Sequence, residues 1–99
     1  MYYVYLLRCT GGSLYAGITT DLGRRYREHR GPGRLGARYT RAHPPLGYAG
    51  AWTAPDRAAA SRLEARLKGL GHGEKEALLG RDLPEHPAVP ETTLREAEA

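Results

Sequence analysis

Four polar side chains near the start of the chain have types and spacing that suit the cleavage of a phosphodiester bond: Tyr5, Tyr15, Arg25 and His29. Such a reaction needs an activated water, positive charge near the phosphoryl oxygens and help for the departing oxygen. Arg25 carries a permanently charged fork that can bind a phosphate and stabilise its transition state. A free phenol titrates near pH ~10, so either tyrosine needs a nearby cation to act as a base at neutral pH. His29, one helical turn after Arg25, could instead take the proton or hold a tyrosine hydroxyl.

The sequence around these residues resembles the GIY-YIG nuclease superfamily. Tyr-Val-Tyr at residues 3–5 and Tyr-Ala-Gly at residues 15–17 stand where that family has its two triplets. Arg25 follows Tyr15 by ten residues, as the family's catalytic arginine does. His29 follows Arg25 by four residues, which is the usual spacing in the family. The resemblance therefore implies a nuclease whose catalytic residues are Tyr5, Tyr15, Arg25, His29 and Glu64.

The resemblance covers roughly residues 2 to 79 and extends to residues 36–41 and 63–68, which are similar to small stand-alone bacterial members. The chain departs from the family in its first triplet, which lacks Gly and Ile. Ile18 stands where the excision-repair incision nucleases have a lysine, and their late asparagine has no counterpart.

The resemblance also implies that Glu64 binds a metal ion. A single carboxylate that leaves several waters on the ion suits one Mg²⁺ or Mn²⁺ better than a two-metal site. From spacing alone, Glu64 could equally form an exposed helical ion pair with Lys68, four residues later.

Positive charge is concentrated in one stretch of the sequence. Residues 24 to 41 contain seven arginines and one acidic residue, Glu28, and residues 1 to 79 carry a formal charge of +7. Arginine forks pair with phosphates, and an interleaved tyrosine can stack on an exposed base. The candidate nucleic-acid contacts are Arg24, Arg34, Arg38, Tyr39 and Arg41. The expected partner is DNA, or alternatively RNA.

Three classes of function fit these residues. The first is a metal-dependent DNA endonuclease. The second is a nucleic-acid-binding module that uses the same basic face with negligible turnover. The third is an adaptor whose basic face meets an acidic protein.

The two tyrosines lie on two predicted strands, residues 2–9 and 14–19, which are rich in aromatic and branched residues. The Gly-Gly turn between these strands predicts a hairpin. A loop of two or four residues would pair Tyr5 with Ile18, and a loop of three or five would pair it with Gly17. Only the second register puts Tyr5, Tyr15 and Gly17 on one face of the sheet. The resemblance favours that register.

The remaining pattern predicts an α/β (α+β) fold with a small three-stranded antiparallel sheet and three to four flanking helices. Thr20 or Asp21 can cap one helix, and Asp56 can cap a second, longer one. The other expected elements are a helical turn at 34–40, a strand at 46–52 and a short helix at 73–79.

Composition predicts one domain at residues 1–79, followed by an acidic tail at 80–99 that contains prolines and is poorly ordered. Cys9 is the only cysteine, so no intramolecular disulfide can form. No apolar run reaches the ~18 residues of a membrane span. We therefore expect a cytoplasmic protein without a membrane segment.

Overall fold

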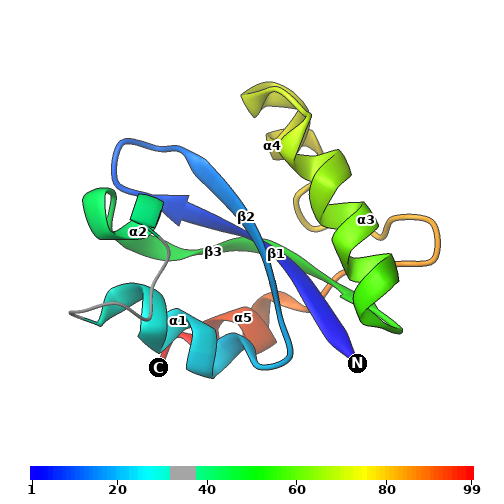
Figure 1. Ribbon diagram of the computed structural model, residues 1–99, viewed down its shortest axis with the longest axis horizontal. Coiled ribbons are helices and arrows are strands. Elements are labelled where there is room, and N and C mark those ends of the chain that lie inside the picture. Colours follow the sequence, from blue (N-terminus) through cyan, green and yellow to red (C-terminus); the bar gives the residue numbers. More distant parts are fainter. Residues whose placement is uncertain (32–37) are drawn as a thin grey trace.

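The protein is described by a computed structural model that covers residues 1–31 and 38–99 (Figure 1). Its three strands, β1 (Tyr2–Cys9), β2 (Leu14–Thr19) and β3 (Pro45–Ala54), form an antiparallel sheet in the order β2-β1-β3. The described helices are α1 (Leu22–Arg30), α2 (Arg38–Ala42), α3 (Arg57–Lys68), α4 (His72–Leu78) and α5 (Glu91–Ala97). The predicted α+β fold with a three-stranded sheet is confirmed. Most of the helical turn predicted at 34–40 lies outside the described residues.

The register of the hairpin is the one that the resemblance favoured. Tyr5 pairs with Gly17 and Leu7 pairs with Tyr15, so Tyr5 and Tyr15 lie on the same face of the sheet. The turn between the strands contains two glycines with φ of 93° and 89°. This left-handed backbone is open to glycine at little steric cost, which explains the Gly-Gly pair at this position.

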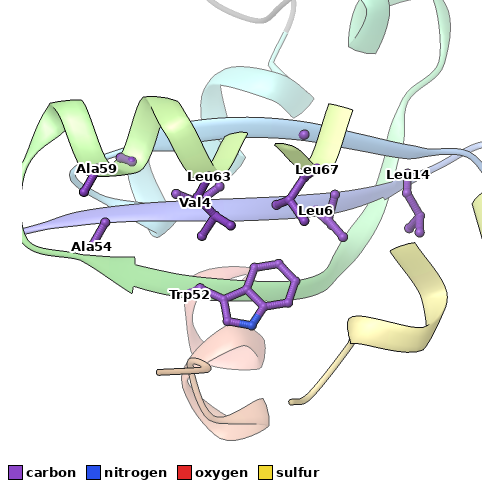
Figure 2. Packing of buried hydrophobic residues seen from close by; sticks show 10 residues of the cluster. Val4, Leu6, Leu14, Trp52, Ala54, Ala59, Leu63 and Leu67 are labelled. Carbon is purple, nitrogen blue, oxygen red and sulfur yellow. The ribbon is translucent and has the colours of Figure 1, made fainter. Parts of the chain in front are cut away.

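Helices cover both faces of the sheet, with α3 and α4 on one side and α1 and α5 on the other (Figure 1). Val4, Leu6 and Trp52 pack under α3 in the first layer (Figure 2). Tyr5 and Leu7, whose side chains point the other way, belong to the second layer. The alternation of side chains along β1 therefore sends Tyr5 into the layer that contains α1.

The first and third helices begin where the sequence predicts. The Asp21 carboxylate accepts a hydrogen bond from the Arg24 amide at 2.9 Å, and the Asp56 carboxylate accepts one from the Ala59 amide at 2.8 Å. Each bond satisfies an amide that the helix itself leaves without a partner. These caps fix the helix starts and hence the positions of the side chains that follow.

The expectation of a poorly ordered tail at 80–99 is wrong. The Thr53 amide donates to the Pro87 carbonyl at 3.0 Å and the Val89 amide donates to the Ala51 carbonyl at 2.8 Å, so the segment covers the outer edge of β3. Leu94 on α5 is 2% exposed and packs in the second layer. A few apolar side chains and one strand edge are enough to order a segment whose composition is polar.

In the described part of the chain, no helix combines the length and the apolar character needed to cross a membrane.

Candidate active site

The centre of the candidate site is the hydroxyl of Tyr5, which lies in the middle of β1 and is 1% exposed as a residue. Gly17 lies opposite Tyr5 on β2. A Cβ atom on Gly17 would lie 2.3 Å from the Tyr5 hydroxyl oxygen, far inside contact distance. The phenol therefore occupies the space that a side chain at position 17 would need, which explains the glycine in the second triplet.

Helix α1 brings a basic group and an imidazole to that hydroxyl. His29 Nε2 lies 2.8 Å from the Tyr5 oxygen, and Arg25 Nε donates to the same oxygen at 3.4 Å. The other side of Arg25 is held by Glu28, whose carboxylate accepts from a guanidinium nitrogen at 2.9 Å. Arg25 and His29 reach one atom because they lie one helical turn apart on the face of α1 turned toward the sheet.

Burial sets the protonation states of this pair. Loss of hydration raises the pKa of Tyr5 to about 12, although the hydrogen bond and charge of Arg25 act in the opposite direction. Burial, together with the positive charge of Arg25, lowers the pKa of His29 to about 4. At neutral pH Tyr5 therefore keeps its proton and His29 is uncharged, so the imidazole can accept a proton.

Glu64 approaches from the other helical layer. It lies on α3, which packs chiefly against β2 and β1, and its side chain is 22% exposed. Burial is the main cause of the raised pKa of Tyr5, and the negative charge of the Glu64 carboxylate adds to it. The predicted pair with Lys68 also exists, at 3.5 Å. Glu64 thus forms this surface pair and still acts electrostatically on the Tyr5 hydroxyl.

Tyr15 and Tyr39 form a stack beside these groups. Their ring centroids are 5.4 Å apart with an angle of 8° between the planes, and the Tyr15 ring meets His29 edge-on at 5.8 Å. The Tyr39 hydroxyl donates to Ser13 on the hairpin loop, and His43 stacks on Tyr39 at 4.5 Å. Tyr39, predicted as a nucleic-acid contact, is 37% exposed and also holds Tyr15 in place.

The arginines predicted to contact nucleic acid lie on the surface where they are described. Arg24 on α1 is exposed and contacts Thr20 and Glu28, while Arg38 and Arg41 are exposed on α2. Arg34 lies outside the described residues.

Thr40 was not among the predicted site residues. It lies on α2 between two exposed neighbours, is itself 2% exposed, and its hydroxyl lies 2.7 Å from His29 Nδ1. A helix of five residues is too short for a periodic pattern to reveal its inward side. The one sequence feature that could have pointed to Thr40 is its position as a small hydroxyl residue within an arginine-rich stretch.

Replacing Gly17 with alanine should disrupt the site through packing alone. The added methyl group must displace the Tyr5 ring, and we expect unfolding to become easier by about 1–3 kcal/mol. Urea denaturation measures this change. Gly73→Ala is the matched control, because no atom lies within 4 Å of its added Cβ, and it should leave stability unchanged or slightly higher. Equal stability of Gly17→Ala and the parent protein would contradict the close approach of Tyr5.

The family model of the GIY-YIG catalytic domain matches residues 1–76 of this chain. The chain belongs to the GIY-YIG family. The matched region includes residues 3–5 and 15–17, the segments that place Tyr5, Tyr15 and Gly17 on one face of the hairpin. The matched region contains every predicted catalytic residue and ends before α5.

The chain is also similar to proteins from several bacteria. The UPF0213 protein of Xanthomonas axonopodis pv. citri is 52% identical over 79 residues, which are 79% of this chain and 74% of the relative. The UPF0213 protein of Vibrio cholerae serotype O1 is 43% identical over 81 residues, 79% of this chain and 76% of the relative. The solution NMR structure of the UPF0213 protein BH0048 from Bacillus halodurans is 40% identical, covers 79% of this chain and 82% of that chain, and has a TM-score of 0.49.

Proposed function

We propose that this protein is a DNA endonuclease that hydrolyses phosphodiester bonds with a single divalent metal ion and leaves a 3′-hydroxyl and a 5′-phosphate. One observation carries the proposal. The Tyr5 hydroxyl contacts an uncharged imidazole and a guanidinium, within the electrostatic reach of a carboxylate. A GIY-YIG catalytic domain over most of the chain supports the same class of reaction.

The proton path follows from the protonation states. Tyr5 takes a proton from the attacking water and passes its own proton to His29 Nε2, 2.8 Å away. Neither group has to be charged beforehand, so the high pKa of the buried phenol is no obstacle. Arg25 binds the scissile phosphate and stabilises the negative charge that develops on it and on the Tyr5 oxygen. Tyr15, beside His29, completes the catalytic set and contacts the phosphate from the second strand.

The donor set fits one Mg²⁺ or Mn²⁺ ion. Within residues 1–31 and 38–99, no three His, Cys, Asp or Glu side chains gather into a cage for a metal. Glu64 would hold the ion by one carboxylate, with phosphate oxygens and waters as the remaining ligands, which is a usual arrangement for Mg²⁺. When bound, the ion supplies positive charge that polarises the phosphate and stabilises the leaving alkoxide.

The basic surface beside the site is the proposed contact for the DNA backbone. Arg24, Arg38 and Arg41 are all exposed on α1 and α2, the helices that carry His29 and Thr40. Backbone contacts of this kind position a substrate without reading its sequence. We assign the protein to the cytoplasm, where its lone buried Cys9 stays a thiol.

The experiment is a cleavage assay with purified protein on single-stranded, duplex, flapped and branched DNA, with Mg²⁺ or Mn²⁺ and with EDTA. We expect metal-dependent products that a ligase can rejoin, since a ligase requires a 3′-hydroxyl and a 5′-phosphate. Binding without cleavage on every substrate would replace the endonuclease with the alternative function, a nucleic-acid-binding module that holds DNA or RNA on the same face.

The double variant Arg38→Ala with Arg41→Ala should weaken DNA binding to a similar extent across sequences. The plot of log affinity against log salt should become shallower by about one unit for each phosphate that the variant no longer neutralises. Fluorescence anisotropy over a salt series measures the slope. The control is Arg62→Ala with Arg66→Ala, which removes the same charge from a groove lined by α3 and residues 84–86. An equal change in both double variants would show a general charge effect and remove α2 from the interface.

A further inference from the structure

The hydrogen bonds around Tyr5 determine which nitrogen of His29 carries the proton. The Tyr5 hydroxyl meets two groups, Arg25 Nε at 3.4 Å and His29 Nε2 at 2.8 Å. Arginine nitrogens only donate, so the proton of Tyr5 cannot be directed to Arg25. Within the described part of the chain, the acceptor for the Tyr5 proton is His29 Nε2.

An imidazole that accepts at Nε2 and is uncharged must carry its proton on Nδ1. His29 Nδ1 lies 2.7 Å from the hydroxyl oxygen of Thr40, a hydrogen-bond distance. The donors then form one consistent series: Arg25 to Tyr5, Tyr5 to His29 Nε2, and His29 Nδ1 to Thr40. In the described part of the chain, no buried side-chain nitrogen or oxygen is left without a partner, so this series leaves His29 fully satisfied.

We infer that Thr40 is a positioning residue that holds His29 as the Nδ1–H tautomer, with Nε2 free to receive the proton of Tyr5. The inference rests on the proposed nuclease function and extends it to a side chain on α2. Its proposed effect on the reaction passes through the 2.7 Å contact between its hydroxyl and His29 Nδ1. When His29 takes the Tyr5 proton, its two N–H groups point at Tyr5 and Thr40, so no reorientation is needed during the reaction.

The same geometry predicts what happens without the hydroxyl. Thr40→Val keeps the branched shape and removes the acceptor, so a buried N–H on Nδ1 would be left without a partner. The proton then favours Nε2, which becomes a donor to the Tyr5 oxygen and can no longer accept the proton of Tyr5 across 2.8 Å. Tyr5 thereby loses its route for passing on a proton. Thr40→Ser keeps the hydroxyl and should keep the tautomer.

The test uses the full chain labelled with ¹⁵N, because NMR of the histidine ring nitrogens reports the tautomer directly without any need for turnover. We expect protonated Nδ1 and unprotonated Nε2 for His29 in the parent protein and in Thr40→Ser, and a shift toward the other tautomer in Thr40→Val. A parent protein with the proton on Nε2 would overturn the inference, even if no variant could be prepared. So would an unchanged tautomer in Thr40→Val.

Kinetics supply a second readout. Removing the hydrogen-bond partner that orients a metal-bound histidine typically reduces activity about 10–100-fold, and we take the same range for the orientation of His29. We expect Thr40→Val to lower kcat by that factor, to leave the Kd for DNA unchanged, and to be rescued by Thr40→Ser. Equal reductions in the valine and serine variants, or an effect confined to Kd, would assign Thr40 a packing or binding role. If the parent protein cleaves no DNA, the proposed function fails while the NMR result still decides the role of Thr40.

Discussion

Glu64→Gln is expected to abolish DNA cleavage while DNA binding stays intact or becomes slightly tighter. Glutamine keeps the volume of the side chain and its place on α3 but removes the negative charge that would hold the metal ion. Turnover should fall by at least about 10²–10³-fold, the reduction typical of removing one preorganised electrostatic contribution at a transition state. Binding should not weaken, because a negative charge near the phosphate is removed.

The matched control for Glu64→Gln is Glu91→Gln. Both glutamates lie on helices and pair with a basic residue four positions later, at 3.5 Å in each case, so the two substitutions cost a similar, small amount of stability. A gel-based cleavage assay with Mg²⁺ or Mn²⁺ and an anisotropy titration separate turnover from affinity. Cleavage by the parent protein that survives both EDTA and Glu64→Gln would contradict the single-metal mechanism.

The part of the site that could be predicted from the sequence is the part governed by local periodicity. Alternation along two strands placed Tyr5, Tyr15 and Gly17 on one face once the loop length was chosen, and helical spacing placed Arg25 and His29 together. These relations depend only on residues close to one another in the chain. The loop length itself came from the family resemblance, because two registers were equally compatible with the turn.

Contacts between distant segments could not be predicted in this way. Thr40 reaches His29 because the chain returns to the site on α2, and the tail at 80–99 is ordered because β3 offers an unpaired edge. The composition of α2 does not reveal that Thr40 contacts His29, and the composition of the tail does not reveal that it pairs with β3. The protonation states were also beyond the sequence, since the high pKa of Tyr5 and the low pKa of His29 arise mainly from burial.

Arg25→Ala should lower turnover about 10²–10³-fold and also weaken DNA binding. Arg25 is the positive group that donates to the Tyr5 oxygen and the proposed contact of the scissile phosphate, so its removal affects both proton transfer and charge stabilisation. Arg25→Lys keeps the charge but not the planar fork, so its turnover should lie between that of the parent protein and that of Arg25→Ala. Arg24→Ala, its exposed neighbour on α1, is the control and should weaken binding with little change in kcat.

The pH dependence of Arg25→Ala gives a second, more specific outcome. His29 can accept the Tyr5 proton only while it is uncharged, so activity is lost as the pH falls through the pKa of His29, about 4 in the parent protein. Removing the positive charge of Arg25 raises that pKa toward its ordinary value, while burial still holds it below. The acidic limb of the kcat/KM profile should therefore move to higher pH in Arg25→Ala and stay in place in Arg24→Ala. A profile that only falls in height, with an unmoved acidic limb, would show that His29 is not the acceptor, because the charge of Arg25 acts on the imidazole at close range.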